Sequence, residues 1–350
     1  MPPGRRDTEL ETAGEVAARI DAAASLAELP SGAQAIDALI ESLHRRGVKI
    51  SLIAGVVSDL NQRLFARAWS LIAPAGLVAN SCLVVMGSEG RGEQILKTDQ
   101  DNALLLRDGF SMDGVQQVTD RFTAELINFG YPRCPGNIML SNPLWCQPLG
   151  SFKQTLRGWM FDGDPDGRMN LAIFVDSAAV AGDASLLLQA RQFVDRFLVD
   201  NDAFFAHFAR AADQFSEPDG WWARLTHLRD HDEPALDLKK LGTFPVVHGV
   251  RTLALQHHVS ELGTAARLQV LADRGHLPAP MARDLTEALH VLMALKLSNN
   301  LRQRHAGEVT DNLVRLSTLG TRERDLLKDT LAIVKRFRQH LHQHYRLDAL

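Results

Sequence analysis

The sequence predicts an α/β or α+β core between two helical regions, and three observations support this prediction. Residues 1–76 carry apolar side chains at helical spacing, and this spacing returns from residue 184 onward. Between residues 82 and 176 the apolar residues instead form short runs with β-branched members, which is typical of buried strands. A chain of 350 residues is long enough for two or three domains. We expect domains at 1–76, 77–183 and 184–350.

The first region should fold as helices separated by a break at Gly47. Apolar residues before the break fall at i, i+3, i+4 and i+7, namely Ile36, Leu39, Ile40 and Leu43. The pattern continues after it at Ile53, Val56, Val57, Leu60 and Leu64. Pro74 and Gly76 should end this region.

The middle region should contain four strands and two helices. The apolar runs predict strands at 82–86, 103–106, 137–140 and 171–176. Helical spacing predicts helices at 115–129 and 152–161. These elements would form a domain of modest size.

The last region should be a helical bundle. Helices are predicted at 186–208, 246–259, 285–301 and 324–344. We expect Phe204, Phe205 and Phe208 to pack in the core. The pair Trp221-Trp222 should also be buried, with an exposed partner-binding patch as the alternative.

Composition narrows the class of protein. Hydrophobic residues make up 45% of the chain and charged residues 23%, as in ordinary globular proteins. The formal net charge of −4 provides no general basic field, so we expect no nucleic acid partner. No apolar run has the roughly 20 residues needed to span a bilayer, and the N-terminus has no apolar leader. Three cysteines suggest a reducing compartment, and we expect a cytoplasmic protein without a membrane partner.

The segment most informative about chemistry covers residues 84–106, VVMGSEGRGEQILKTDQDNALLL. A predicted strand runs into Gly87-Ser88, where glycine lets the backbone turn sharply and approach a phosphate. A helix beginning there would direct free N–H groups at an anion. Arg91 and Lys97 add positive charge nearby. These four residues are our candidates for holding a nucleotide.

Asp99 and Asp101 follow at the start of the next predicted strand. Alternate side chains of a strand point to one face, so the two carboxylates should converge. Because like charges repel, a shared cation would stabilise the pair. Mg²⁺ binds through one or two carboxylates and completes its shell with water and substrate phosphates. The spacing therefore predicts a site for Mg²⁺, or for Mn²⁺ in its place. The histidine clusters, His257-His258 and His340/His342/His344, lack metal-ligand spacing and are interpreted as solvated helix faces.

Gly-Ser, about ten residues and then Asp-x-Asp resembles the signature of the DNA polymerase β-like nucleotidyltransferase superfamily. More closely, GSEGRGEQ…TDQDNA is similar to a bacterial nucleotidyltransferase family that is often fused to CBS or cyclic-nucleotide-binding domains. The resemblance continues through 134–145, 170–183 and 236–242 and covers roughly residues 35–345. The PII uridylyltransferase and the glutamine synthetase adenylyltransferase carry a related GSxGRxE…SDxD pattern. The resemblance implies an α+β fold, a polymerase β-like nucleotidyltransferase domain with a small mixed sheet, flanked by N-terminal helices and a C-terminal helical bundle.

The resemblance also implies a third carboxylate, on a later strand, that joins the metal site and deprotonates the attacking group. Asp176, at the end of LAIFVD, is the preferred candidate, and Asp183 is its rival. Asp183 also suits an N-cap for a helix beginning at Ala184, and we favour that interpretation.

The segment LDLKKLG, residues 236–242, loosely resembles DLKxGxGGxxDI of the two named relatives. This resemblance would place Lys239 or Lys240 near the triphosphate, whereas the spacing alone suggests a solvated pair at a helix end. The double glycine is missing, and His248 stands where an acid is expected. Gln100 is likewise polar where the wider superfamily has an apolar residue.

Together these features predict an enzyme that moves an NMP from an NTP to an acceptor hydroxyl. The relatives imply a protein acceptor, a role in signal transduction and an upstream sensor domain or partner. Two alternatives are a regulatory module that binds nucleotide without transfer and a small-molecule nucleotidyltransferase of the aminoglycoside-modifying type.

Overall fold

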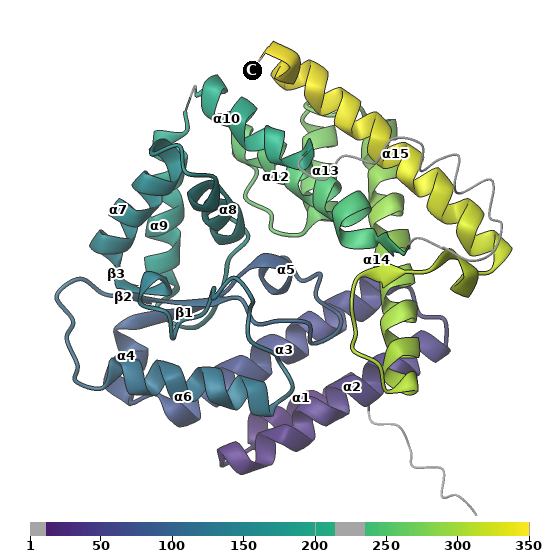
Figure 1. Cartoon of the computed structure of the whole chain (residues 1–350). Helices are drawn as coiled ribbons and strands as arrows, with labels where there is room; N and C mark the ends of the chain where they lie inside the picture. The colour runs from purple at the N-terminus through teal and green to yellow at the C-terminus, as the bar shows by residue number, and fades with distance from the viewer. Residues whose placement is uncertain (1–11, 200, 214–234, 350) are drawn as a thin grey trace, which may run out of the picture. The chain divides into compact units, whose positions relative to one another are not determined.

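A computed structural model describes residues 12–199, 201–213 and 235–349. The chain divides into two compact units (Figure 1). The first unit comprises Met1–Thr155 and Asp176–Ala190, and the second comprises Leu156–Val175 and Arg191–Leu350. No helix in these ranges is long and apolar enough to cross a membrane. The pair Trp221-Trp222 lies outside the described residues.

The first unit begins with helices that pack on one another and on the sheet. They are α1 (Ala13–Ala22), α2 (Leu29–Arg45), α3 (Ile50–Ile72) and α4 (Ala75–Ala79). Gly47, with φ +69°, separates α2 from α3 at the predicted break, because glycine adopts this left-handed conformation without steric cost. Helix α3 packs against β4 (Ala178–Gly182) and α6 (Val115–Asn128). Figure 1 shows α3 and α6 below the sheet. The N-terminal helices therefore share a unit with the strands.

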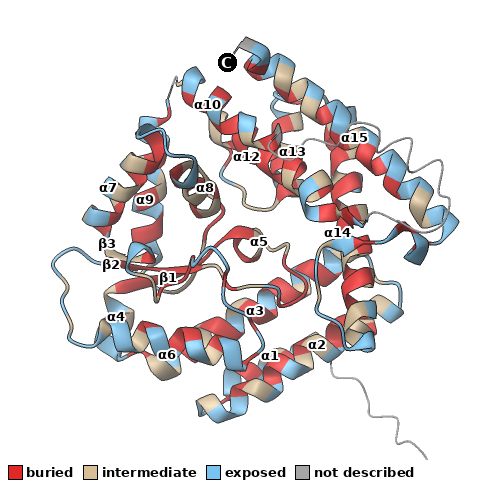
Figure 2. Ribbon diagram, in the orientation of Figure 1, coloured by how far each residue is buried: buried red, intermediate tan, exposed pale blue. Residues whose placement is uncertain are grey.

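The sheet of the first unit has four strands in the order β3-β2-β1-β4. Strand β1 (Ser81–Val85) is antiparallel to both β2 (Asn102–Leu106) and β4, whereas β2 is parallel to β3 (Cys146–Pro148). Every residue of β1 and β2 is buried, and both strands are red in Figure 2. The fold is therefore α+β with a small mixed sheet, and the predicted strands at 82–86 and 103–106 are confirmed.

Two predicted strands are wrong. Residues 137–140 have no regular secondary structure, although the Ile138 carbonyl still accepts a hydrogen bond from the Asn102 N–H at 3.1 Å. Residues 171–174 end helix α8 (Pro165–Phe174), which begins because the Asp164 carboxylate accepts the N–H groups of Asp166 and Gly167. The strand follows instead at β4. An apolar run of this length fits a buried helix as well as a strand, and the cap at Asp164 decides for the helix.

The second unit is almost entirely helical around α12 (Phe244–Gln256), ten of whose residues are buried. Helix α12 packs against α10 (Asp202–Ala209), α13 (Thr264–Asp273) and α15 (Thr321–Tyr345). Helix α14 (Ala279–Ala306) packs on α13 and α15. The predicted bundle helices are confirmed except that 186–208 is two helices.

Other helices and strands of the described residues are α5 (Gly87–Gly90), α7 (Leu149–Phe161), α9 (Ala184–Phe197), β5 (Leu236–Asp237) and β6 (Leu313–Val314).

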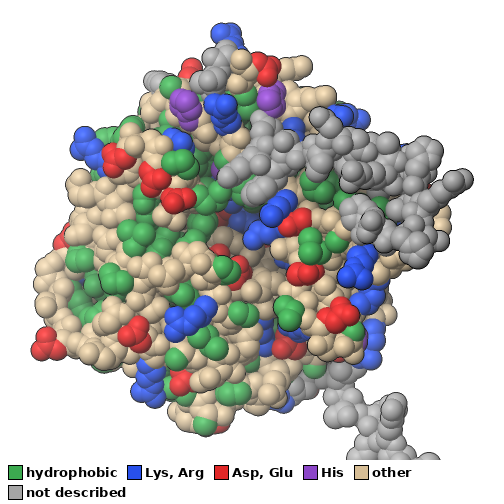
Figure 3. All heavy atoms as spheres, in the orientation of Figure 1, with side chains coloured by type: hydrophobic (Ala, Val, Ile, Leu, Met, Phe, Trp, Pro, Cys, Tyr) green, Lys and Arg blue, Asp and Glu red, His purple; other side chains and the backbone are tan. Residues whose placement is uncertain are grey.

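The division of the 186–208 prediction has a local cause. Asn201 accepts a hydrogen bond from the Phe204 N–H at 3.0 Å and starts α10 as a separate helix. Phe204, Phe205 and Phe208 are buried, as predicted. On the face drawn in Figure 3, acidic and basic side chains are interspersed, in keeping with the small net charge.

Candidate active site

The turn after β1 brings the Gly-Ser and Asp-x-Asp sequences together. We call residues 87–101 the motif loop. The Met86 N–H donates to the Asp101 carbonyl at 2.9 Å, and Gly87 then turns with φ +59°. A Cβ at Gly87 would lie 2.7 Å from the Asp101 Oδ2 atom. Glycine is therefore required here for two reasons, the backbone angle and the space that the Asp101 carboxylate occupies.

Asp99 and Asp101 alternate with two buried amides. Gln100 and Asn102 are 3% and 2% exposed, whereas Asp99 and Asp101 are only partly buried. The Gln100 side chain donates to the Tyr131 carbonyl at 3.1 Å, and the Asn102 carbonyl oxygen Oδ1 accepts the Leu140 N–H at 2.9 Å. This alternation leaves the two carboxylates on the less buried side of an extended segment. The polar Gln100 is explained by its hydrogen bond to the chain beyond α6.

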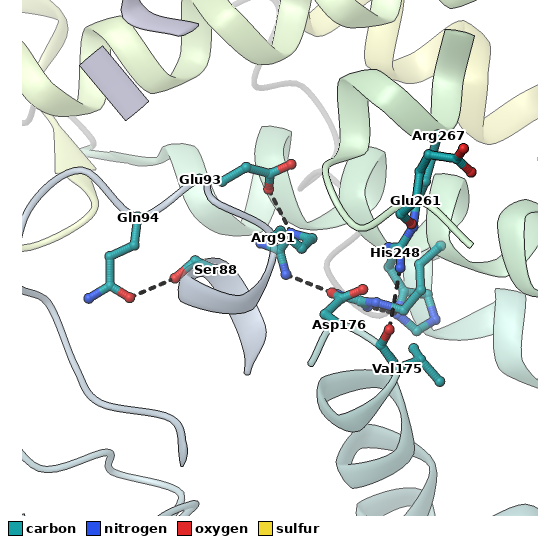
Figure 4. A network of polar contacts seen from close by, with 10 residues as sticks. Ser88, Arg91, Glu93, Gln94, Val175, Asp176, His248, Glu261 and Arg267 are labelled. Atoms are coloured by element: carbon teal, nitrogen blue, oxygen red, sulfur yellow. Dashed lines mark hydrogen bonds and ion pairs between the residues drawn. The ribbon is translucent and has the colours of Figure 1, made fainter. Parts of the chain in front are cut away.

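Gln94 connects the serine to the aspartates. The Ser88 hydroxyl donates to Gln94 Oε1 at 3.1 Å (Figure 4). Gln94 Nε2 in turn donates to the Asp99 carbonyl at 3.0 Å. Gln94 is buried. The sequence analysis did not select Gln94, although it lies inside the GSEGRGEQ motif.

Arg91 lies between two carboxylates rather than facing solvent (Figure 4). Its guanidinium contacts Glu93 at 2.6 Å and Asp176 at 2.7 Å, and its side chain is 10% exposed. Burial would lower the pKa of Arg91, but the two carboxylates outweigh burial and raise it. Arg91 therefore remains charged, and its bonds in this structure are to the protein's own acids.

Asp176 lies beside the motif loop, in the turn between α8 and β4. Its side chain is fully buried. A Cβ at Gly90 would overlap the Asp176 carbonyl oxygen, so only glycine allows this approach. Because Ala178 pairs with Val85, Asp176 lies near the end of β1 from which the motif loop starts.

Asp183, the rival third carboxylate, caps α9. Its Oδ1 atom accepts the Ser185 N–H at 3.0 Å, and its Oδ2 atom contacts Arg107 at 2.7 Å. The hydrogen bonds from Ser185, helped by the charge of Arg107, lower the pKa of Asp183. The predicted N-cap is confirmed.

Glu89 is a buried acid that the sequence analysis missed. It is 4% exposed, and its Oε2 atom accepts from Asn61 Nδ2 of α3 at 3.1 Å. Asn61 in turn accepts from the Tyr131 hydroxyl at 2.6 Å. Burial raises the pKa of Glu89 to about 8, and the charge of Asp99 adds to this rise while Asn61 opposes it. An acid inside a Gly-rich turn was the only sequence signal.

Cys134 is a second missed neighbour of the site. Its thiol hydrogen-bonds to the Asp101 side chain. Burial, followed by the charge and hydrogen bond of Asp101, raises the pKa of Cys134 to about 12. The thiol therefore stays protonated and supports the carboxylate as a donor.

Lys97 reaches α2. Its Nζ atom donates to the Ala33 carbonyl at 2.7 Å and to Asp37 Oδ2 at 2.8 Å, and it lies 5.4 Å from the centroid of the Tyr131 ring. The Lys97 side chain is 4% exposed. The structure thus brings Gly87, Ser88, Asp99, Asp101, Arg91 and Asp176 around one loop and directs the Lys97 ammonium to a helix.

Lys239 and Lys240 belong to the second unit. The Asp237 Oδ1 atom accepts both of their backbone N–H groups, at 2.9 and 3.0 Å, and both lysines are exposed. His248, which stands where an acid was expected, is buried. Its Nε2 atom lies 2.6 Å from the Phe208 carbonyl and its Nδ1 atom lies 3.1 Å from Arg251. Since a carbonyl can only accept, Nε2 carries the proton and Nδ1 accepts from Arg251.

The predicted histidine clusters are not simply solvated helix faces, because the rings of His257 and His276 stack with centroids 3.7 Å apart.

Within the described ranges, no group of three or more His, Cys, Asp or Glu side chains is arranged to hold a metal. Mg²⁺ needs only one or two carboxylates, since water and substrate phosphates fill its remaining positions. Two partly exposed aspartates on one side of a segment are a donor set that fits this ion.

Two family models match the chain. The first, described as "Putative nucleotidyltransferase DUF294", matches residues 34–166, and the second, "Putative nucleotidyltransferase substrate binding domain", matches residues 202–345. The chain belongs to the DUF294 nucleotidyltransferase family. The DUF294 match contains the whole motif loop, whereas Asp176 falls between the two matched ranges. No curated protein matches the chain.

Proposed function

We propose that this protein is a Mg²⁺-dependent nucleotidyltransferase that moves an NMP from an NTP to a hydroxyl of a protein acceptor. The observation that carries the proposal is the placement of Asp99 and Asp101. They share the less buried side of one segment, and Asp101 lies against the Gly87 turn. A pair of carboxylates beside a turn whose N–H groups can face a phosphate is the arrangement that nucleotidyl transfer requires.

Each residue of the loop has a defined part in this proposal. Asp99 and Asp101 would hold Mg²⁺, which on binding neutralises the triphosphate and makes pyrophosphate a better leaving group. The backbone N–H groups of the Gly87 turn, that of Ser88 included, would bind phosphate oxygens, while the Ser88 hydroxyl donates its single hydrogen to Gln94. Arg91 would act mainly by fixing Asp176.

The Asp176 carboxylate is fully buried and paired with Arg91 at 2.7 Å, so it would support the motif loop rather than contact the substrate. The attacking hydroxyl, from a Tyr, Ser or Thr side chain of the acceptor, would pass its proton to solvent. Its oxygen forms a bond to the α-phosphorus, the bond from that phosphorus to the β-phosphate bridge oxygen breaks, and pyrophosphate leaves.

The matched substrate binding domain supports a sizeable acceptor. It covers residues 202–345, a helical unit larger than a small acceptor needs. The resemblance of the motif loop to enzymes that modify proteins points the same way. A protein acceptor also suits a role in signal transduction.

Transfer can be tested with α-labelled ATP, UTP, GTP and CTP, each incubated with pure enzyme, Mg²⁺ and host lysate. We expect label on a protein, and we expect its loss with Asp99→Asn but not with the matched variant Asp183→Asn at the α9 cap. Label confined to small molecules would instead indicate an antibiotic-type enzyme. Nucleotide binding without any label would indicate a regulatory module.

A further inference from the structure

The motif loop has little regular structure of its own between Arg91 and Asp101. After α5 ends at Gly90, the only ladder contact in this part of the described chain is an isolated bridge from Gln100 to Arg133. Backbone hydrogen bonds tie the N–H groups of Gly92, Glu93 and Gln94 to the Glu89 and Ser88 carbonyls. Beyond Gln94 the segment keeps its shape mainly through side-chain contacts with its surroundings. The contacts made by Lys97, two residues before Asp99, therefore bear on the metal site.

Lys97 carries a buried charge in this segment. Its ammonium has three N–H donors, and it meets the Ala33 carbonyl, the Asp37 carboxylate and the face of the Tyr131 ring. Asp37 is 29% exposed, whereas the Lys97 side chain is 4% exposed. A charge this deeply buried is tolerated only with partners, so the Lys97–α2 contact resists separation.

Helix α3 holds the same loop at two further points. Asn61 donates to Glu89 at 3.1 Å. The Ser58 hydroxyl oxygen lies 3.3 Å from the position that a Cβ at Gly92 would take. Two N-terminal helices thus contact the loop at its start, its middle and just before Asp99.

We propose that α2 and α3 set the position of Asp99, and that Lys97 and Asp37 are positioning residues rather than phosphate ligands. This role differs from the one expected for Lys97 from the sequence. In this arrangement, Asp37 affects the position of Asp99 although the two residues are 62 positions apart in the sequence. The effect on nucleotide binding rests on the proposed function, whereas the ordering of the loop does not.

Hydrogen exchange of the full chain, measured well below its unfolding transition, tests the ordering directly. Lys97→Met should accelerate exchange of amides at 92–99 by roughly tenfold or more, because the loop opens locally. Asp37→Asn should produce a smaller acceleration in the same peptide, and Lys97→Arg should restore part of the protection. Asp37→Asn also covers the case in which Lys97→Met fails to fold.

Arg63→Met is the matched control. It breaks one exposed ion pair with Asp21 of α1 and one with Asp59 within α3, without touching the motif loop, so exchange at 92–99 should not change. Mn²⁺ binding in the presence of a non-hydrolysable NTP provides the second readout. Asp37→Asn should weaken this binding slightly, and Lys97→Met should weaken it more.

Wild-type exchange at 92–99 in folded Lys97→Met and Asp37→Asn would overturn the proposal. If Lys97→Met then also lost nucleotide binding, Lys97 would be a phosphate ligand after all. If the wild-type protein bound no Mn²⁺ and nucleotide, the proposed function would fail, and the exchange data would still decide whether α2 orders the loop.

Discussion

The motif loop, 87–101, and the segment 236–243 both carry charged residues beside a short strand, yet they use them in opposite ways. In the motif loop Arg91, Glu89 and Lys97 are buried or nearly so, and each contacts a specific side chain. In 236–243 the lysines are exposed, and Asp237 accepts two backbone N–H groups and lies 3.9 Å from the Lys240 ammonium.

This difference indicates which of the two segments is preorganised before a ligand binds. Burying a charge costs free energy unless it is paired, so a loop with several buried charges is held in one geometry. Such preorganisation is what electrostatic catalysis requires. Exposed lysines on flexible stems can adapt to a ligand but do not define its position. The comparison predicts large effects in the first segment and small effects in the second.

The largest effect should come from the aspartate pair. Asp99→Asn and Asp101→Asn should each lower transfer on the order of 10³-fold or more, because each removes a charged metal ligand. Circular dichroism should show an unchanged fold. Steady-state rates with α-labelled NTP provide the measurement, and a double variant with wild-type turnover would contradict the metal assignment.

Arg91→Met should cost about 3–5 kcal/mol of unfolding free energy, because it leaves the buried Asp176 carboxylate without its counterion. Urea unfolding measures this loss. The matched control is Arg107→Met, which breaks a pair with Asp183 whose arginine is 51% exposed, and it should cost less than about 1 kcal/mol. Equal losses of unfolding free energy in the two variants would show that the Arg91–Asp176 pair stabilises the fold no more than the exposed Arg107–Asp183 pair does.

Glu89→Gln should stabilise the protein by about 1–3 kcal/mol near pH 8 and have little effect near pH 5. The pKa of Glu89 is raised to about 8, so between its ordinary value and 8 the folded state keeps a proton that the unfolded state has lost. The unfolding free energy therefore falls as pH rises through this window. Glutamine does not titrate, so Glu89→Gln removes the contribution of residue 89 to this pH dependence. Thermal unfolding across pH measures it.

The exposed Glu308→Gln should leave the pH profile of stability unchanged, which makes it a suitable control. A Glu89→Gln profile parallel to that of the wild type would contradict the raised pKa.

The smallest effects should come from Lys239→Ala and Lys240→Ala. Each should change the unfolding free energy by less than about 0.5 kcal/mol, because the side chains are exposed. Any effect should appear as a higher KM for nucleotide. Asp237→Ala in the same segment should cost about 1 kcal/mol, since it leaves two N–H groups without their acceptor. If either lysine variant lost as much kcat as Asp99→Asn, the proposed difference between the motif loop and segment 236–243 would be wrong.

The sequence by itself determined the strands at 82–86 and 103–106, the bundle helices other than 186–208 and the aspartate pair. These features depend on periodicity and on residues close in the chain, such as Gly87 beside Ser88 or Asp99 beside Asp101. Asp183 was correctly assigned as a cap for the same reason, because its acceptor role involves Ser185, two residues away.

Only the tertiary structure decided what the buried charges contact. Arg91 meets Asp176 across 85 positions, Lys97 meets Asp37 across 60, and Glu89 meets Asn61 across 28. No local pattern specifies such pairs, because a charged side chain in a Gly-rich loop fits a phosphate ligand and an internal counterion equally well. The choice depends on which helix packs against the loop, and that is set by the burial of the helix faces rather than by the motif itself.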